Sequence, residues 1–310
     1  MKLGGNWKSS KVTDDILQAA INRLNAAINI GYRHFDHADI YCLGKSQIVF
    51  GQWLEQLKEH ELTRQDLLIQ SKAGVILPEK VNENYKQKLP GRYDFSKEHI
   101  FESIHNSLRN LNIEHLDAFL LHRPDLLMNP RSVAKTLDEI IDQKLATKVG
   151  VSNFSAPQID LIQNFMNHPI SISQIEFNPS FADLLANGLA PKSNQPQVNN
   201  FFFGLYEYCF KNDIEIQAYS PFAAGKIRTP VNDKHNSILN QTIQEVAKET
   251  GKTFEQVVVA WIQTPAIAIK PVIGTTDLNR LSNIFSSKES TLSKPQWYRI
   301  FNAGREQGVP

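Results

Sequence analysis

Four side chains that could move a proton follow three consecutive strands of the predicted fold. Asp36 comes directly after a short strand at residues 32–35, and Tyr41 lies five residues further on. Lys72 and His122 end the next two strands along the chain. Consecutive strands of a barrel place their carboxyl ends side by side, so we expect the four side chains to converge on one rim. An acid, a phenol, an ammonium and an imidazole together would form a proton-transfer site.

Each of these residues also has an ordinary structural explanation. Tyr41 fits a packed loop aromatic, and Asp36 fits a helix cap or a turn residue. Lys72 fits a solvated loop lysine, and His122 fits a buried histidine with a backbone partner. The functional interpretation depends on the four residues jointly, because random placement rarely produces a convergent set.

The elements that must position these residues alternate between strands and helices. Thr13 and the two acids behind it predict the start of a first helix, and Gly31 predicts its end. Thr253 and Gln256 form a capping-box pattern that opens a later helix. Apolar runs without polar alternation, which a sheet buried on both faces requires, recur between helical patterns. We expect eight strands, near residues 2–5, 32–35, 67–70, 118–121, 148–151, 172–176, 214–217 and 266–272.

Eight strands separated by helices favour one α/β domain over residues 1–310, folded as a (β/α)8 TIM barrel. No glycine-rich phosphate fingerprint opens any of the helices, which argues against a doubly wound sheet. Two long polar connections, residues 75–97 and 181–200, are expected at the C-terminal face, where such loops shape an active site.

The composition is that of an ordinary globular protein. The 310 residues include 33 Lys and Arg and 32 Asp and Glu, a net charge of +1, so we expect no nucleic-acid partner. No apolar run is long enough to cross a membrane, and the N-terminus lacks the apolar core of a signal peptide. Two cysteines cannot form a disulfide framework, and no Cys/His cluster has zinc spacing. We therefore expect a cytoplasmic protein with no membrane partner and no metal.

The chain resembles the aldo/keto reductase family along nearly its whole length. Seven segments match in family order: Gly-Tyr-Arg-His-Phe-Asp-His-Ala-Asp-Ile-Tyr (31–41), Gln-Ser-Lys-Ala-Gly (70–74), Leu-Asp-Ala-Phe-Leu-Leu-His-Arg-Pro-Asp (116–125), Val-Gly-Val-Ser-Asn-Phe (149–154), Ser-Gln-Ile-Glu-Phe (173–177), Ala-Tyr-Ser-Pro-Phe (218–222) and Lys-Pro-Val-Ile-Gly-Thr-Thr (270–276). The Phe-Asp-His-Ala-Asp and Leu-His-Arg-Pro-Asp segments are most like a bacterial subgroup of uncharacterised reductases.

The resemblance implies reduction of an aldehyde or ketone to an alcohol by hydride transfer from NADPH. It makes Tyr41 the general acid, with Lys72 favouring the ionised phenol and Asp36 holding Lys72 charged and in place. His122 would donate a hydrogen bond to the carbonyl oxygen. We expect a small-molecule carbonyl substrate and a monomeric enzyme.

The resemblance also implies a set of cofactor contacts. The expected nicotinamide contacts are Ser152, Asn153, Gln174 and Tyr219. The expected pyrophosphate loop supplies Ser220, Phe222, Gly225 and Lys226. The expected adenosine-phosphate segment supplies Gly274, Thr275, Thr276 and Arg280. Backbone N–H groups at that helix start, together with Arg280, suit a 2′-phosphate, so we expect NADPH rather than NADH.

Several positions depart from the family pattern or stay open. Gly274 stands where the family often has lysine, and Asn283 where an acidic adenine contact is common. Gln47 and Cys42 replace a frequent Glu and Gly, and Cys42 is either a redox-sensitive thiol or a packed cysteine. Trp7 either lines the substrate pocket or packs in the core.

Two other functional classes compete with an NADPH-dependent reductase. One is a non-catalytic, NADPH-binding regulatory subunit on the same fold. The other is a barrel lyase or isomerase, for which the sequence shows no metal site and no Schiff-base arrangement beyond Lys72.

Overall fold

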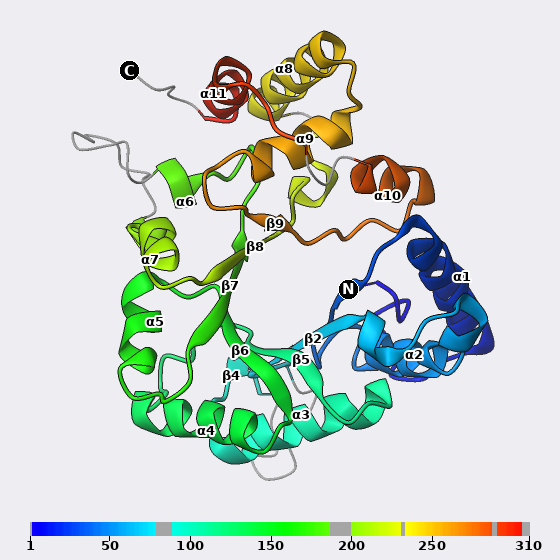
Figure 1. Ribbon diagram of the computed structural model, residues 1–310, viewed down its shortest axis with the longest axis vertical. Coiled ribbons are helices and arrows are strands. Elements are labelled where there is room, and N and C mark those ends of the chain that lie inside the picture. Colours follow the sequence, from blue (N-terminus) through cyan, green and yellow to red (C-terminus); the bar gives the residue numbers. More distant parts are fainter. Residues whose placement is uncertain (1, 79–88, 187–199, 231–232, 287–289, 306–310) are drawn as a thin grey trace. The chain divides into compact units, whose positions relative to one another are not determined.

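The computed structural model describes residues 2–78, 89–186, 200–230, 233–286 and 290–305. The chain divides into two compact units, Met1–Ile172 and Ser173–Pro310. Each unit has its own parallel strands and covering helices (Figure 1). Strand β7 (Ile170–Glu176) starts in the first unit and ends in the second.

The first unit contains a parallel sheet with the strand order β1, β2, β5, β6. Its strands are β1 (His34–Asp36), β2 (Leu68–Ala73), β5 (Leu116–Leu121) and β6 (Ala146–Ser152). Its α-helices are α1 (Asp14–Ile30), α2 (Lys45–Leu54), α3 (Lys97–Leu111), α4 (Pro130–Asp142) and α5 (Ala156–Gln163). Phe119, Leu120 and Leu121 are all fully buried, although their side chains point alternately to the two faces of the sheet. This is expected for a strand that is covered on both faces.

The boundaries of α1 and α9 (Phe254–Gln263) follow the capping signals of the sequence. Thr13 accepts a hydrogen bond from the Ile16 N–H, and Gly31 closes α1 in the left-handed conformation at φ 115°. Thr253 caps α9 in a complete capping box with Gln256.

The strand expected at residues 2–5 does not form. This segment is a turn, in which the Gly5 N–H donates to the Lys2 carbonyl at 3.1 Å and Gly5 adopts a φ of 80°. A positive φ takes the backbone out of the extended region that a strand requires, and glycine adopts it without steric cost. Among the described residues, the other seven expected strands form as β1, β2 and β5 to β9.

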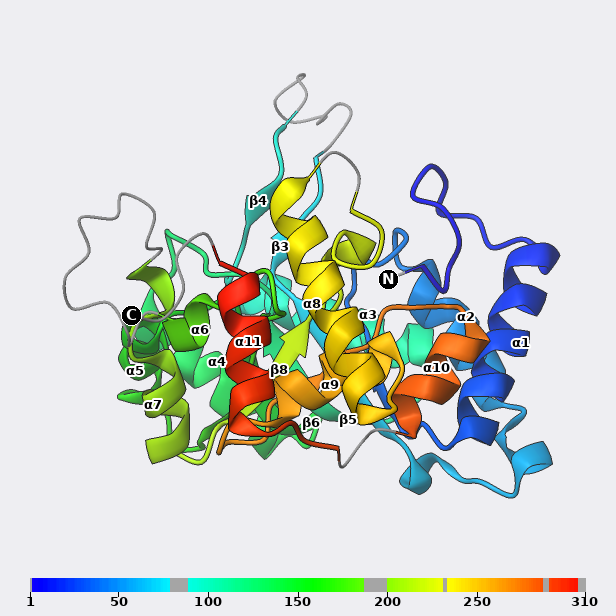
Figure 2. The ribbon, with the colours of Figure 1, turned by 90° about the horizontal axis from the view of Figure 1, so that it is seen from above.

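The second unit is helix-rich. After the end of β7 come β8 (Glu215–Tyr219) and β9 (Lys270–Pro271), which pair in parallel. Its α-helices are α6 (Asp183–Ala186), α7 (Leu205–Lys211), α8 (Lys234–Thr250), α9, α10 (Leu278–Phe285) and α11 (Lys294–Ala303). Helix α11, which sequence patterns did not reveal, runs beside α8 in Figures 1 and 2. Trp261 of α9 and Trp297 of α11 stack at 5.2 Å and donate their indole N–H groups to each other's carbonyl oxygens.

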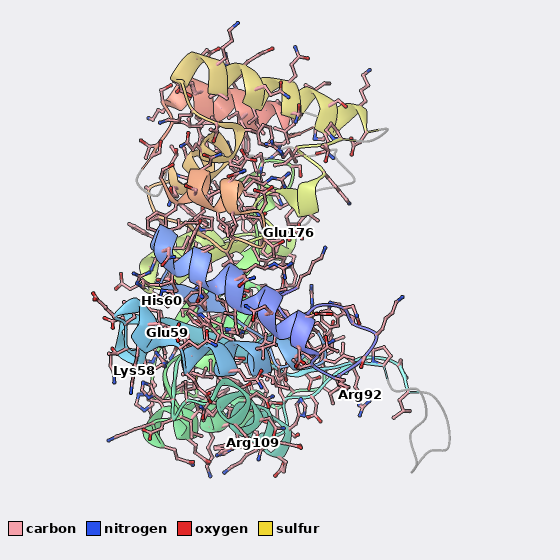
Figure 3. The ribbon with its side chains drawn as sticks, turned by 90° about the vertical axis from the view of Figure 1, so that its right-hand side faces the viewer. Lys58, Glu59, His60, Arg92, Arg109 and Glu176 are labelled. Carbon is pink, nitrogen blue, oxygen red and sulfur yellow. The ribbon has the colours of Figure 1, made fainter. Side chains whose placement is uncertain are left out.

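Short elements occupy the long connections. In the first connection, β3 (Val75–Ile76) and β4 (Arg92–Tyr93) form an antiparallel hairpin, where Arg92 is labelled in Figure 3. The second contains α6 and ends at η4 (Asn200–Phe202). Residues 79–88 and 187–199 of the two predicted loops lie outside the described residues.

Aromatic packing fixes β1 against α2, and hydrogen bonds to Asn25 of α1 hold α2 and the short helix that follows it. Phe35 contacts Phe50 and Trp53, with ring centroids 5.0 and 5.9 Å away. The indole N–H of Trp53 donates to Asn25 Oδ1 of α1, and His60 Nε2 lies 2.9 Å from the same oxygen. His60 belongs to η1 (Leu57–His60), whose outer residues are labelled in Figure 3. In the described part of the chain, no helix combines the length and apolar character needed to span a membrane.

A glycine in α2 permits close contact with α3. A Cβ at Gly51 would lie 2.3 Å from the Asn110 carbonyl oxygen and 2.8 Å from the Leu111 carbonyl carbon, both backbone atoms. We expect Gly51→Ala to lower the free energy of unfolding by about 1–3 kcal/mol in urea titrations. Gln52→Ala, on the exposed side of α2, should stay within about 0.5 kcal/mol of wild type. Equal stability of the two variants would contradict the close approach of α2 to the α3 backbone at Gly51.

Candidate active site

A buried ion pair joins the first two strands of the sheet. Lys72 Nζ donates to Asp36 Oδ1 at 2.5 Å and to the His37 carbonyl oxygen at 2.8 Å. Asp36 pairs with Gln70 in the β1–β2 register, and Lys72 lies two residues further along β2, so its side chain is on the same face as Gln70. The Lys72 side chain has no exposed surface, and that of Asp36 is 14% exposed.

The charge of Lys72 depends on Asp36. Burial lowers the pKa of Lys72 below its usual range, and the Asp36 carboxylate raises it again through its charge and its hydrogen bond. A buried ammonium is costly without such a partner. Lys72 lies inside β2, which continues to Ala73, and not at the end of the strand as expected from the sequence.

Tyr41 lies in a tight turn after β1. Backbone hydrogen bonds tie this turn to β2, from the His37 N–H to the Gln70 carbonyl and from the Asp39 N–H to the Lys72 carbonyl. Beyond Tyr41 the backbone turns sharply, because Cys42 and Leu43 both have left-handed φ angles, 53° and 60°. Lys72 Nζ lies 5.2 Å from the centroid of the Tyr41 ring.

His122 follows β5 directly. Its N–H donates to the Ala73 carbonyl at 2.9 Å, and its ring lies edge-on to Tyr41, with centroids 6.0 Å apart. Burial, followed by the charge of Lys72, lowers the pKa of His122 to about 3. The imidazole is therefore neutral at pH 7 and has one N–H to donate. The structure thus brings all four predicted proton-transfer residues together in the first unit.

Two predicted cofactor contacts, Ser152 and Asn153, lie beside His122 in the same unit. Both are buried at the end of β6, and Asn153 has a left-handed φ of 63°. Asn153 Nδ2 donates to the His122 carbonyl oxygen at 3.1 Å and to Ser152 Oγ at 3.0 Å.

The other predicted cofactor residues belong to the second unit. Gln174 of β7 is buried and donates to Gln217 Oε1 at 3.0 Å, and Tyr219 ends β8. The turn behind Tyr219 begins with Ser220, at a φ of 52°, and continues through Phe222. Lys226 at the end of that turn is exposed.

The two glycines expected near the phosphates have open surroundings. A Cβ at Gly225 or Gly274 would meet no atom within 4 Å, and Gly225 has a φ of 93°. Thr275 accepts a hydrogen bond from the Asp277 N–H, and the neighbouring Thr276 is exposed. These features leave the backbone at both segments accessible to a ligand.

Sequence patterns did not reveal the acidic neighbours of Arg280. Its Nε lies 3.9 Å from Glu255 Oε1 and 3.8 Å from Asp277 Oδ2, the N-cap of α10. Glu255 also pairs with Arg228 Nη1 at 2.6 Å. Glu255 is 25 residues away from Arg280 in the chain, so only the fold could show this contact.

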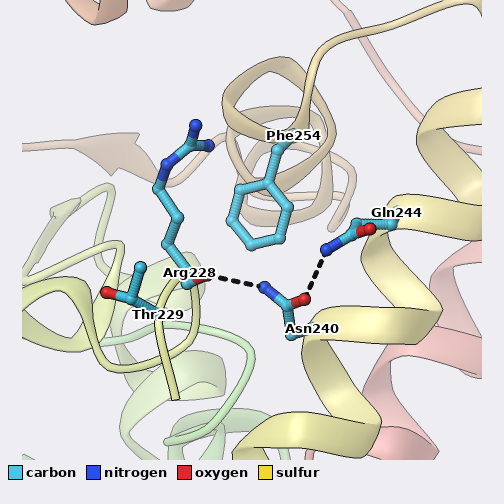
Figure 4. A pocket seen from close by; sticks show the side chains of 5 residues that line it. All are labelled: Arg228, Thr229, Asn240, Gln244 and Phe254. Atoms are coloured by element: carbon cyan, nitrogen blue, oxygen red, sulfur yellow. Dashed lines mark hydrogen bonds between the residues drawn. The ribbon is translucent and has the colours of Figure 1, made fainter. Parts of the chain in front are cut away.

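A pocket of about 300 Å³ adjoins this charged group in the second unit. Figure 4 shows its lining residues, which are Arg228, Thr229, Asn240, Gln244 and Phe254. Asn240 donates to the Arg228 carbonyl and accepts from Gln244. None of the lining residues was predicted as a site residue.

Trp7 and Cys42 differ in exposure. The Trp7 side chain is 41% exposed, which does not fit the core-packing alternative. Cys42 is fully buried, and its Sγ donates to the Gly5 carbonyl oxygen at 3.2 Å, as expected for a packed cysteine.

Residues 1–304 match the family model described as the Aldo/keto reductase family. The chain is similar to the uncharacterized oxidoreductase YcsN of Bacillus subtilis (strain 168), at 28% identity over 284 residues, which is 91% of this chain and 87% of that protein. The structure is similar to that of the thermostable aldo-keto reductase Tm1743, with a TM-score of 0.71 and 23% identity over 97% of this chain and 92% of that chain. It is also similar to aldo-keto reductase AKR2E5 of the silkworm, Bombyx mori, in complex with NADPH, with a TM-score of 0.71 and 20% identity over 96% and 81% of the two chains. These likenesses confirm the predicted fold class, the (β/α)8 barrel.

The half-buried Asp39 should make stability depend on pH. Burial raises its pKa to about 7, against the hydrogen bonds from Ile40 and Ser103 and the charge of Lys72. In the unfolded chain Asp39 titrates near pH 4. Between about pH 4 and pH 7 the unfolded chain therefore ionises while the folded protein holds its proton, and the folded state loses stability as the pH rises through this window. Below about pH 4 both states are protonated and nothing is lost. We expect Asp39→Asn to gain stability over wild type across this window, by about 1–2 kcal/mol after allowing for solvent screening.

Urea unfolding of both proteins between pH 4 and 8 measures the difference. Asp213→Asn, at an exposed acid, serves as the control. Its free energy of unfolding should differ from that of wild type by the same amount at every pH. A constant offset for Asp39→Asn as well would show that Asp39 ionises normally in the folded protein.

Proposed function

Because the chain belongs to the aldo/keto reductase family, we propose that it reduces an aldehyde or ketone with NADPH and that Tyr41 supplies the proton. Carbonyl reduction with a nicotinamide cofactor is the activity of this family, and the chain is an oxidoreductase of that kind. The observation that supports the residue assignment is the position of Lys72, 2.5 Å from Asp36 and 5.2 Å from the Tyr41 ring.

The proposed proton transfer follows from the charges in the first unit. When bound, a nicotinamide cofactor would supply the hydride that adds to the carbonyl carbon. The carbonyl oxygen gains negative charge at that moment and takes the proton from the Tyr41 hydroxyl, which yields the alcohol. The Lys72 ammonium stabilises the phenolate that is left, and the neutral His122 ring donates a hydrogen bond to the oxygen. Positioned proton transfer of this kind is worth roughly 10²–10⁴-fold in rate.

The chemistry of the donor set fits a nicotinamide dinucleotide. Ser152, Asn153 and Gln174 carry the hydroxyl and amide groups that a carboxamide needs, and we assign Tyr219 to stacking on the ring. The pyrophosphate would lie against the segment of Ser220, Phe222, Gly225 and Lys226. The open space around Gly225 and Gly274 supports this assignment, because nothing within 4 Å of a Cβ position there keeps a phosphate from the backbone.

The choice of NADPH depends on Arg280, Thr275 and Thr276. Arg280 is exposed and can pair with a 2′-phosphate in a charge-assisted, bidentate way. Glu255 and Asp277 already face its guanidinium, so a phosphate must compete with two carboxylates. We therefore propose a preference for NADPH that is modest, since Gly274 supplies no second cation.

The remaining proposals concern the substrate and the state of the protein. Trp7 has enough exposed indole surface to contact a small carbonyl substrate, and we propose that it does. We also propose a monomer that works in the cytoplasm. The alternative of a regulatory subunit gains no support from the similar Bacillus subtilis protein YcsN, which is named as an oxidoreductase.

Tyr41→Phe tests the proton donor. With NADPH and a panel of aromatic and aliphatic aldehydes and ketones, we expect kcat to fall about 10²–10⁴-fold because the hydroxyl is lost. The Kd for NADPH should change by less than about twofold, since the phenyl ring remains. Tyr298→Phe, at an exposed tyrosine of α11, should keep the wild-type rate. A wild-type rate in Tyr41→Phe, or an NADPH complex that reduces no compound of the panel, would count against the proposal.

Arg280→Ala tests the cofactor preference. We expect the Kd for NADPH, from fluorescence titration, to rise about tenfold, as for the loss of one charged hydrogen-bonding partner. The Kd for NADH should change by less than about twofold. Arg299→Ala removes a surface arginine that pairs with Glu249 and should leave both constants unchanged. Equal losses for NADPH and NADH would show that Arg280 does not read the 2′-phosphate.

A further inference from the structure

A buried amide shares the carboxylate oxygen that holds Lys72. Gln70 Nε2 donates to Asp36 Oδ1 at 2.5 Å, the same oxygen that accepts from Lys72 Nζ at 2.5 Å. Gln70 is 1% exposed. Gln70 and Lys72 are two residues apart on β2, so both side chains are on the face of the sheet that Asp36 occupies.

The orientation of this amide follows from hydrogen-bond chemistry. An ionised carboxylate only accepts hydrogen bonds, so the NH₂ group of Gln70 must face Asp36. The amide oxygen of Gln70 then faces His34 Nε2, 3.1 Å away, which must carry a hydrogen. His34 therefore fixes the amide from one side, and Asp36 fixes it from the other.

From this contact we infer that Gln70 is a positioning residue for the reaction, which acts on Tyr41 through Asp36 and Lys72. A hydrogen bond to a carboxylate stabilises its charged form. An ionised Asp36 in turn keeps the buried Lys72 charged, and a charged Lys72 favours the Tyr41 phenolate. Nothing in the sequence pattern assigns this role to Gln70. The inference depends on the proposed role of Tyr41.

Other titratable groups also surround Asp36 and Lys72. Among the described residues, the titratable groups that interact electrostatically with Asp36 or Lys72 include His37, Asp39 and His122. Burial lowers the pKa of both histidines to about 3, so they are neutral at pH 7. Asp39 carries a negative charge once ionised and accepts from the Ile40 N–H.

Gln70→Met removes the donor and keeps the length and approximate volume of the side chain. The matched control is Gln47→Met. Gln47 is equally buried and donates to Ser71 Oγ at 2.8 Å and to Ser107 Oγ at 2.9 Å. Ser71 lies between Gln70 and Lys72 in β2, so its side chain is on the opposite face of the strand. Both variants lose a buried amide, but only the amide of Gln70 donates to Asp36.

The first readout needs no turnover. Ionisation of Tyr41 is followed as phenolate absorbance against pH, with the matching Tyr41→Phe protein subtracted to remove the other tyrosines. We expect Gln70→Met to move the ionisation midpoint of Tyr41 upward by at least about half a pH unit, because Lys72 loses part of its charge. Gln47→Met should leave the midpoint at the wild-type value. Equal midpoints in wild type and Gln70→Met would overturn the inference.

The second readout separates kcat from KM. With an aldehyde that the wild type reduces, Gln70→Met should lower kcat about tenfold and leave the KM for NADPH within about twofold. A fall in kcat of the same size in Gln47→Met would show a general structural effect and would overturn the inference. If Gln70→Met does not fold, His34→Ala takes its place, because it frees the amide from its other partner at an exposed position. A smaller shift in the same direction is then expected, and an unchanged midpoint overturns the inference.

The two proposals fail in different ways. If the wild type reduces no carbonyl compound, the proposed function fails, while the midpoint measurement still tests Gln70. If the wild type is active and Gln70→Met matches it in midpoint and kcat, only the role of Gln70 fails.

Discussion

The buried ion pair between Asp36 and Lys72 is the interaction on which the rest of the site depends. A lysine without exposed surface loses its hydration, and its pKa falls unless a carboxylate offsets the loss. Asp36 does so from 2.5 Å, on the neighbouring strand. The pair places a positive charge 5.2 Å from the Tyr41 ring without exposing that charge to water, where it would be screened.

The same burial gives two basic residues different charge states. Lys72 and His122 are both desolvated, and burial is the largest cause of the fall in pKa for each. For Lys72 the carboxylate of Asp36, in hydrogen-bond contact, raises the pKa again, whereas the pKa of His122 is about 3 and its ring is neutral at pH 7. One site therefore contains a cation that stabilises a phenolate and a neutral N–H that suits a carbonyl oxygen. Environment, and not residue type alone, separates these roles.

Local signals in the sequence predicted much of the fold. The caps at Thr13, Gly31 and Thr253 act through their own hydrogen bonds and φ angles, so they can be read without tertiary information. The convergence of Asp36, Lys72 and His122 follows from the order of parallel strands. The segment at residues 2–5 was expected to be the first strand, but the left-handed φ of Gly5 makes it a turn.

The rest depended on contacts that no local pattern encodes. Gln70 looked like an ordinary strand residue, and only the β1–β2 register places its amide on Asp36. Glu255 reaches Arg280 from a different helix. Helix α11 is held through the paired tryptophans Trp261 and Trp297, which are 36 residues apart. Such long-range pairs decide the charges at the site and the packing of α11. The spacing of apolar residues along the sequence does not reveal them.

The most direct test of this account is the titration of Lys72 itself. The Cε resonance of ¹³C-labelled lysine, assigned by comparison with Lys72→Met, reports the charge of Nζ as the pH is raised, in wild type and in folded Asp36→Asn. The account predicts that the midpoint of Lys72 falls by at least about two pH units when the carboxylate is removed, as for a buried lysine that has lost its partner. An unchanged midpoint in Asp36→Asn would show that Asp36 does not hold the charge on Lys72, and the central claim would be wrong.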